Sequence, residues 1–336
     1  MSKTAPPSDR NFSKRFRRLL LHWYDRSHRK LPWRGEMDPY RILVSEIMLQ
    51  QTRVAVVEHR YAEFLKRFPT VQKLARAREQ AVLAAWSGLG YYRRARSLRQ
   101  AAITILRQQS FPRTASELEM LPGVGRYTAA AVASIAFGEP AAVVDGNVKR
   151  VLSRIAGRDL SDSQSWQLAG ELLERRRPGD FNQAMMELGG MVCLPNGNPK
   201  CSDCPVVALC SWRRPKAKAT AHSRRKAELR YLLVRRKGAI LLRRRPASSS
   251  LMPLMWELPE VREPLKLEPL LKLRHSITNT SYTVLVFARE NYAARGSCWV
   301  PLRKAAKLPL TGLTRKILRQ VRSGLSLIVF THRLAK

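Results

Sequence analysis

Two acidic residues stand where a carboxyl group could take part in a reaction. Glu46 is the only charged residue in ILVSEIMLQQT (42–52), a stretch that is apolar on nearly every face of a helix. Burial disfavours the charged form of a carboxyl group, so we expect Glu46 to stay protonated and to be able to act as a general acid. The structural alternative is a hydrogen bond to a neighbouring side chain. Asp145 heads the helical pattern NVKRVLSRIAG (147–157), where it could be a plain N-cap or face a reacting centre.

The segment Leu121-Pro-Gly-Val-Gly125 separates two helical patterns. Gly123 and Gly125 permit positive φ angles and a close approach of the backbone. Backbone N–H groups can therefore point outward beside a helix N-terminus, an arrangement that suits an anion such as a DNA phosphate. An ordinary corner between two helices would explain the same five residues without any ligand.

Four of the five cysteines fall close together, with the spacing Cys193-x7-Cys201-x2-Cys204-x5-Cys210. This clustering is typical of metal ligation in a reducing compartment rather than of a disulfide framework. All-thiolate ligation suits either tetrahedral zinc or an iron–sulfur cluster. Spacing alone does not choose between the two. Cys298 stands apart and is interpreted as a buried small apolar residue.

The composition indicates a globular protein with a polyanionic partner. The 336 residues include 62 Lys and Arg against 25 Asp and Glu, a formal net charge of +37. A surface this basic attracts DNA, RNA or an acidic membrane, unless the charge reflects a general Lys/Arg bias. No apolar run approaches the roughly 20 residues of a membrane span, and the first twenty residues lack the pattern of a secretory signal. We therefore expect a cytoplasmic protein that is not bound to a membrane.

The pattern along the chain changes near residue 212. Before it, the periodicity predicts helices only, and the length favours about two domains. The expected helices cover 12–25, the stretch from Asp38-Pro39 onward, 53–68, 79–86, 92–109, a segment opened by the capping box Thr114–Glu117, 126–137 and 147–157. Residues 212–227 have the composition of a linker. Beyond them, two strand-like runs meet at Lys237-Gly238, SYTVLVFARE predicts a strand and LTRKILRQVRSG a helix, so a small α+β domain follows a mainly α region.

Two longer stretches carry a resemblance to a known family. LPGVGRYTA followed by VVDGNVKRV resembles the helix-hairpin-helix-GPD motif of DNA base-excision glycosylases, and PYRILVSEIMLQQT resembles the stretch that holds the acid in adenine glycosylases of the MutY type. The resemblance implies that Glu46 protonates N7 of adenine and that Asp145 stabilises the oxocarbenium-like sugar. It also implies that Tyr127 and Asn147 position Asp145 and the catalytic water. Lyase relatives of the endonuclease III type keep a lysine at the place of Tyr127, so a monofunctional hydrolytic enzyme is expected.

The same resemblance implies a DNA-binding surface and a cofactor. Gln51 matches the residue that wedges into the duplex, and Tyr92 in GLGYY is chosen as the intercalating tyrosine. The other implied DNA contacts are Leu121, Gly123, Val124, Gly125, Lys149 and, in the loop that recognises 8-oxoguanine, Thr278. FNQAMMELGGMVC resembles the approach to the 4Fe-4S cluster of the superfamily, which favours a cluster over zinc on the four cysteines. Their first gap has seven residues here, against the six usual in the family.

The resemblance covers essentially the whole chain and sets a domain organisation. It implies a six-helix barrel over 30–140, a cluster domain formed by 1–29 and 141–220, a linker at 212–227, and a Nudix-like lesion-recognition domain over 228–336 that lacks the Nudix box. The expected protein is a monomeric adenine DNA glycosylase acting on duplex DNA with A:8-oxoguanine or A:G mispairs, associated with the nucleoid through DNA binding. The alternatives are a thymine-mismatch or endonuclease III-like pyrimidine glycosylase, and a non-catalytic DNA-binding relative.

Overall fold

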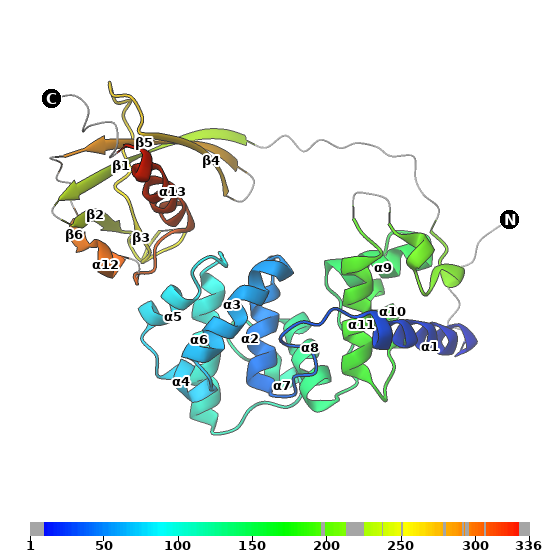
Figure 1. Cartoon of the computed structure of the whole chain (residues 1–336). Helices are drawn as coiled ribbons and strands as arrows, with labels where there is room; N and C mark the ends of the chain where they lie inside the picture. Colours follow the sequence, from blue (N-terminus) through cyan, green and yellow to red (C-terminus); the bar gives the residue numbers. More distant parts are fainter. Residues whose placement is uncertain are drawn as a thin grey trace. The chain divides into compact units, whose positions relative to one another are not determined.

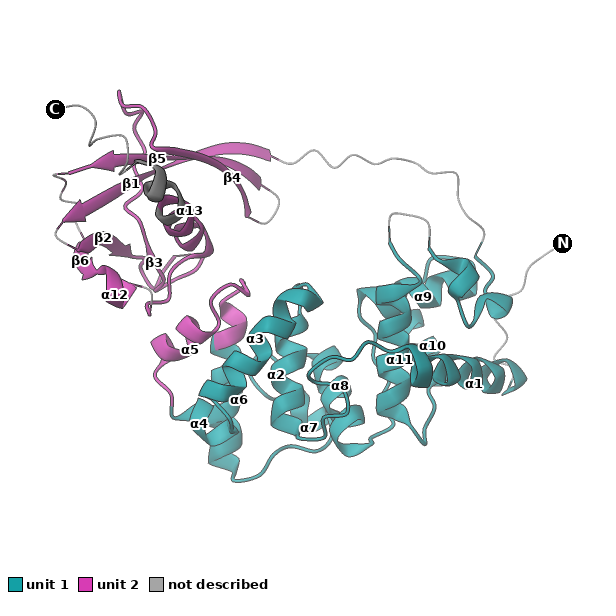
Figure 2. Cartoon of the chain, in the orientation of Figure 1, with its two compact units in different colours: residues 1–76, 96–217 teal, residues 77–95, 218–336 magenta. Residues whose placement is uncertain are grey.

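The computed structural model describes residues 10–195, 199–212, 225–236, 238–249, 251–277, 280–290, 292, 296–305 and 307–328, with side chains as far as residue 321. Contacts divide the chain into two compact units (Figure 2). Unit 1 comprises residues 1–76 and 96–217, and unit 2 comprises residues 77–95 and 218–336. Among the described residues, no helix is long and apolar enough to cross a membrane.

Unit 1 is built from helices, and its described part contains no strand (Figure 1). The helices of unit 1 are the predicted ones, confirmed within a few residues at each end, together with three that were not predicted, over residues 71–75, 162–172 and 178–191. They are α1 (Arg10–Ser27), α2 (Pro39–Leu49), α3 (Val54–Arg67), α4 (Val71–Ala75), α6 (Arg93–Gln108, whose first three residues fall in unit 2), α7 (Ala115–Glu119), α8 (Arg126–Phe137), α9 (Gly146–Ala156), α10 (Asp162–Leu172) and α11 (Pro178–Met191).

The helix boundaries follow from local capping. The Asp38 side chain accepts a hydrogen bond from the Tyr40 N–H at the start of α2, where Pro39 occupies the first turn. Thr114 and Glu117 form the expected capping box of α7. Helices α8 and α9 each end at a glycine with a left-handed backbone. These caps set where α8 and α9 begin and end, and the two helices carry three of the predicted site residues.

Helix α2 lies in the interior of unit 1. Its buried residues run without a break from Ile42 to Met48 and therefore cover every face of the helix. It packs against α3 and α8. Because no face of α2 reaches solvent over these residues, the single carboxyl group in the run, that of Glu46, is buried by the fold itself. A second core joins α1, α8, α9, α10 and α11 around Phe16, Leu20 and Phe181.

Unit 2 contains a mixed sheet with one covering helix, which confirms a small α+β domain. Its elements are α5 (Glu79–Ala85), β1 (Arg225–Arg236), β2 (Ala239–Arg244), β3 (Trp256–Glu257), β4 (Leu271–Ile277), β5 (Thr280–Arg289), β6 (Ser297–Pro301), α12 (Leu302–Ala305) and α13 (Gly312–Ile328). The strand order is β3-β2-β1-β5-β4, with β6 also paired to β2. Strands β1 and β2, on either side of the hairpin predicted at Lys237-Gly238, pair antiparallel, and Lys237 itself lies outside the described residues. Strand β1 runs parallel to β5.

The predicted linker and the predicted recognition loop both adjoin strands of unit 2. Strand β1 begins at Arg225, inside the 212–227 segment, because residues 225–227 pair with Thr280–Tyr282 of β5. Residues 213–224 lie outside the described residues. Strands β4 and β5 form an antiparallel hairpin in which Ile277 pairs with Thr280. Thr278 lies between these two partners and also falls outside the described residues.

Candidate active site

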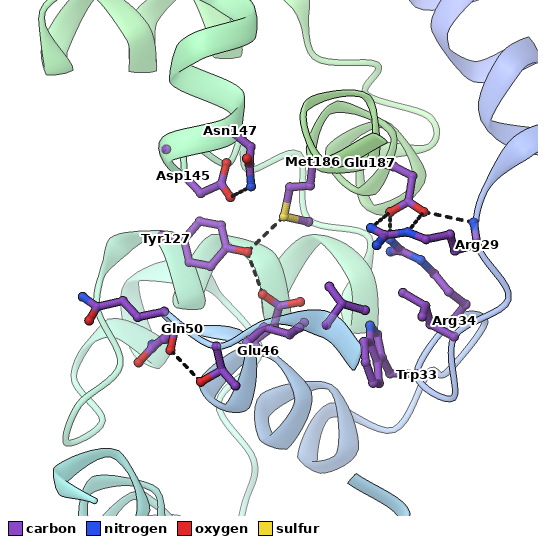
Figure 3. A pocket seen from close by; sticks show the side chains of 17 residues that line it. Arg29, Trp33, Arg34, Glu46, Gln50, Tyr127, Asp145, Asn147, Met186 and Glu187 are labelled. Atoms are coloured by element: carbon purple, nitrogen blue, oxygen red, sulfur yellow. Dashed lines mark hydrogen bonds and ion pairs between the residues drawn. The ribbon is translucent and has the colours of Figure 1, made fainter. Parts of the chain in front are cut away.

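A pocket of about 540 Å3 in unit 1 brings the catalytic candidates together. Its walls come from α2, α8, α9 and α11 and from the loop after α1 (Figure 3). The size is within the range of small-ligand sites. Among the residues that line it are Arg29, Trp33, Arg34, Glu46, Gln50, Gln51, Thr52, Tyr127, Asp145, Asn147, Met186 and Glu187. All four predicted catalytic residues are therefore in one cavity.

Glu46 reaches the pocket from α2 with only 4% of its surface exposed. Burial raises its pKa above the ordinary value, and the charge of Asp145 adds to this effect. A hydrogen bond from Tyr127 and the charge of Arg34 act in the opposite direction but do not cancel the rise. The Tyr127 hydroxyl donates to Oε2 at 2.8 Å. The site thus holds a carboxyl group that favours its protonated form.

Tyr127 connects the two sides of the pocket. Its side chain extends from the first turn of α8 and lies between Glu46 and the pair formed by Asp145 and Asn147 (Figure 3). Burial, followed by the negative charges of Glu46 and Asp145, raises the pKa of the phenol well above its usual value. The hydroxyl, which also lies 3.0 Å from the Met186 sulfur, therefore keeps its proton and acts as a donor.

Asp145 is held by α9, and its two carboxyl oxygens have different partners. Oδ1 accepts the Val148 N–H at 2.7 Å, which makes Asp145 the N-cap of the helix. Oδ2 accepts Nδ2 of Asn147 at 2.9 Å. The amide oxygen of Asn147 in turn accepts from Arg150 at 2.9 Å. Gly189 of α11 permits this arrangement, because a Cβ atom there would lie 2.7 Å from the Cβ of Asn147.

A buried ion cluster on the opposite wall was not predicted from the sequence. Glu187 is 1% exposed and contacts Arg34 at 2.8 Å and Arg29 at 2.7 Å. Burial alone would raise the pKa of Glu187, but the hydrogen bonds from Arg29 and the charge of Arg34 outweigh it and lower the pKa. Arg34 also donates to Gln183. The sequence signal was available: Glu187 is the only charged residue of FNQAMMELGGMVC, as Glu46 is of its own stretch.

The rim of the pocket carries consecutive glutamines with different geometry. Gln50 donates from Nε2 to Thr128 Oγ1 at 3.0 Å and is thereby fixed against α8. Gln51, the predicted wedge residue, is exposed and has a φ of 53°. A non-glycine residue in the left-handed region is strained and is held there by its surroundings. The turn after α2 therefore projects Gln51 out of the fold.

The hairpin before α8 divides into buried and open positions. Leu121 and Val124 are buried and anchor the turn, so they do not offer a side chain to DNA. Gly123 has a φ of 77°, and a Cβ atom there would lie 2.3 Å from the Cβ of Ser97. Gly125 is the N-cap of α8, without a side-chain cap, and a Cβ atom there would have nothing within 4 Å. The open side of the turn is thus formed by backbone.

The remaining predicted DNA contacts lie elsewhere. Lys149 is on α9 and pairs with Asp162 at the start of α10. Tyr92 is 3% exposed in unit 2, where its hydroxyl lies 3.5 Å from the Leu310 carbonyl oxygen, whereas the preceding Tyr91 is 52% exposed with a φ of 44°. A side chain buried in a core is not available to intercalate. Of the two tyrosines, the structure leaves Tyr91, and not the predicted Tyr92, exposed to solvent.

The four predicted ligand cysteines gather after α11 as half-buried free thiols. Burial is the main reason why the pKa of the Cys204 thiol is raised to about 11, and the charges of the other three cysteines add to this rise. A hydrogen bond from the backbone N–H of Val206 offsets part of it. Arg154 lies 3.1 Å from the Cys193 sulfur. Among the described residues, no group of three or more His, Cys, Asp or Glu side chains is disposed to hold a metal ion. The four thiols are therefore neighbours, but their sulfur atoms are not close enough to one another to form a ready metal site among the described residues.

Comparison with known proteins gives the family. The family described as HhH-GPD superfamily base excision DNA repair protein matches residues 44–174. An adenine DNA glycosylase of Homo sapiens is 50% identical over 216 residues, covering 59% of this chain and 39% of its own length. One of Mycobacterium tuberculosis is 42% identical over 203 residues, covering 58% of this chain and 66% of its own length.

Two solved structures show where the similarity in fold lies. A thermostable thymine-DNA glycosylase is 31% identical with a TM-score of 0.56, and the match covers 60% of this chain and 96% of that one. A trapped covalent complex of endonuclease III with DNA is 24% identical with a TM-score of 0.51, covering 59% and 95%, and supports the fold alone. The chain spans about two fifths of the length of the mammalian relatives that it matches. The chain belongs to the HhH-GPD superfamily of base excision DNA repair proteins.

Proposed function

We propose that this protein is an adenine DNA glycosylase that hydrolyses the N-glycosidic bond of adenine paired with 8-oxoguanine or guanine. The observation that carries the proposal is the pair of carboxyl groups in one pocket: Glu46, buried with a raised pKa, and Asp145, fixed at the N-terminus of α9. Similarity to adenine DNA glycosylases from mammals, yeast and bacteria supports adenine as the base.

The reaction requires a proton donor for the base and a negative charge for the sugar. Adenine, flipped into the pocket, accepts a proton from Glu46 at N7, and the C1′–N9 bond then breaks with its electron pair going to the base. The departing adenine is neutral. The carboxylate of Asp145 stabilises the positive charge that develops on the sugar. Water then adds to C1′ and loses a proton, which leaves an abasic site.

Tyr127 and Asn147 position the reacting groups. The Tyr127 hydroxyl orients the Glu46 carboxyl group through its bond to Oε2. Asn147 orients Asp145 and is itself held by Arg150. The phenol at position 127 cannot form the Schiff base that an amine would form, which supports a monofunctional hydrolase. A thymine glycosylase is the second candidate, because a relative of that kind shares 31% identity.

The open backbone of the hairpin and two projecting side chains support duplex DNA as the partner. The hairpin at Gly123 and Gly125 presents backbone to a phosphate. Gln51 and Tyr91 are both exposed and both have positive φ values, so each is fixed in a projecting position suited to entering the base stack. We assign intercalation to Tyr91 instead of Tyr92. Lys149 remains as a candidate contact once its pairing with Asp162 opens.

The cysteine loop is proposed to hold one 4Fe-4S cluster on Cys193, Cys201, Cys204 and Cys210. The donor set fits, because four thiols are neighbours and backbone N–H groups of Val206 and Trp212 already bond to two of the sulfurs. When bound, the cluster would brace the loop that carries the exposed Lys200. Iron and sulfide near four each per chain would support this; stoichiometric zinc from iron-replete, anaerobic cells would contradict it.

Unit 2 is proposed to read the base opposite adenine, as a Nudix-like module. Thr278, which follows β4 in the sequence and lies outside the described residues, is the proposed contact to the lesion; β4 and β5 pair antiparallel on either side of it. A single lost hydrogen bond costs about 0.5–1.5 kcal/mol. Thr278→Ala should therefore lower the ratio of A:8-oxoguanine to A:G excision only a few-fold, measured at one salt concentration.

Release of free base from A:8-oxoguanine, A:G and T:G duplexes tests the proposed activity. Adenine should leave the first two, and thymine should remain in the third. Glu46→Gln should lower single-turnover adenine release by at least the roughly 10²–10⁴-fold typical of general-acid catalysis, with DNA binding near wild type. Release within about tenfold of wild type would exclude Glu46 as the acid. Release of thymine would instead favour the second candidate.

A further inference from the structure

Helix α1 carries a row of basic side chains that the pocket does not use. Arg10, Lys14, Arg18, His22 and Arg26 follow one another at intervals of four residues, so each is adjacent to the next on the helix surface. Four residues turn the helix through about 400°, so the series winds around the helix by about 40° at each step. All five are exposed. None of the four Arg and Lys side chains has an acidic partner or any other polar contact among the described residues. We call these five residues the α1 row.

The opposite face of α1 shows what the fold needs from this helix. Phe16 and Leu20 are fully buried and pack into the core shared with α10 and α11. Arg17, next to the row, donates to the carbonyl oxygens of Glu171 and Leu172 at the end of α10. The only acid on α1, Asp25, pairs with Arg177 at 2.7 Å. The packing of α1 is therefore complete without the α1 row.

The α1 row even opposes the stability of the helix. Like charges four residues apart repel each other on a helix surface, and Arg10, Lys14 and Arg18 form two such pairs in succession. No acidic residue occupies the first turn to balance them. A bound anion would attract these cations and thereby offset their mutual repulsion. The distribution of charge therefore points to a ligand with many negative charges.

We propose that the α1 row binds the phosphate backbone of duplex DNA that flanks the target base. The row spans about 24 Å at 1.5 Å per residue, a length over which duplex DNA carries about 14 phosphate charges. It ends at Arg26, three residues before Arg29 of the pocket, and helix α1 itself lies at one edge of unit 1 (Figure 1). The inference rests on DNA as the proposed substrate.

The chemistry of the row favours DNA over a protein partner. Specific protein interfaces have a core of large apolar side chains. Among the described side chains, none of the exposed large apolar residues lies on α1. The row offers charge alone, which matches a sequence-independent contact to phosphates.

The full-length triple variant Arg10→Gln, Lys14→Gln, Arg18→Gln tests the proposal. Affinity for an undamaged duplex is measured over a range of KCl concentrations for this variant and for wild type. Each lost phosphate contact lowers the slope of log K against log salt by about 0.9, so the slope should fall by up to about 2.7. Single-turnover adenine release at saturating protein should stay within about twofold of wild type, because none of the three residues lines the pocket.

A second triple variant controls for the change in net charge. Lys66, Lys73 and Arg76 are exposed basic residues at the far end of α3 and on and after α4. Their replacement by Gln removes the same three charges, and the slope should remain near wild type. Equal slopes in the two triple variants would overturn the proposal. A melting temperature of the α1 variant at or above wild type shows that its helix is intact. Failure of wild type to release adenine would refute the proposed function, while the salt slopes would still decide the role of α1.

Discussion

The hydrogen bond between Tyr127 and Glu46 predicts a measurable change in the pH dependence of catalysis. Tyr127→Phe keeps the ring but removes the hydroxyl that donates to Oε2 at 2.8 Å. This bond lowers the pKa of Glu46 against the larger effect of burial, so its loss should raise the pKa further. A hydrogen bond to a charged group contributes about 1.5–3 kcal/mol. The same bond to the neutral carboxyl group contributes about 0.5–1.5 kcal/mol, so only the difference between the two acts on the pKa, and the pKa of Glu46 should move upward.

Single-turnover release of adenine from an A:G duplex, followed across pH, measures this shift. The acid must be protonated to act, so the rate of wild type falls as pH rises through the pKa of Glu46. In Tyr127→Phe the same fall should occur at higher pH. Met186→Leu is the matched control, because it changes the other neighbour of the hydroxyl, at 3.0 Å, and leaves the bond to Glu46 in place. An alkaline limb that stays fixed, or moves to lower pH, in Tyr127→Phe would refute the role of Glu46 as the titrating acid.

Three further predictions concern stability and reaction type. The folded-state pKa of Glu46 is raised above its unfolded value of about 4.3. The stabilisation that the protonated Glu46 gives to the folded state is therefore complete below that value and is lost as pH rises through the folded pKa. The melting temperature of Glu46→Gln relative to wild type should accordingly increase with pH. Tyr127→Lys should add an adduct with DNA that borohydride traps, because an amine then lies beside Asp145 in the pocket; no adduct at any pH would contradict this geometry. Gly123→Ala should lower the free energy of unfolding by about 1–3 kcal/mol, because the added Cβ would overlap Ser97. Adding Ser97→Gly to this variant should restore part of the loss in denaturant titrations. A free energy of unfolding that is unchanged in Gly123→Ala would contradict the contact.

Most of the helices, and the two carboxyl groups that the pocket brings together, could be predicted because their signals are local. Caps such as Asp38 and the Thr114 capping box fix helix starts within a few residues. For Asp145 the two sequence interpretations are both compatible with the structure, since Oδ1 caps α9 while Oδ2 faces Asn147. For Glu46, too, the hydrogen bond considered as an alternative coexists with a raised pKa.

The features that were missed depend on contacts between distant segments or on a single backbone angle. Arg29 and Arg34 are more than 150 residues away from Glu187, and no local pattern pairs them. Two consecutive tyrosines give the sequence no means of choosing between them. The backbone has positive φ angles at Gly90 and Tyr91, and it leaves Tyr91 exposed and Tyr92 buried.

The comparison of Glu46 with Glu187 explains why only one of two similar glutamates can serve as an acid. Each is the single charged residue of an apolar stretch, 42–52 for Glu46 and 181–193 for Glu187, and both line the pocket and are almost fully buried. Glu187 contacts two guanidinium groups, which lower its pKa in spite of burial and keep it ionised. Glu46 has a neutral phenol as its partner, which cannot compensate the loss of solvation, so its pKa remains raised. An ionised Glu187 has no proton to give, and its charge is already used to hold the arginines of the loop after α1. The pattern of a lone glutamate in an apolar helix therefore marks a buried carboxyl group, and the charge of its partner decides whether that group is an acid or an anchor.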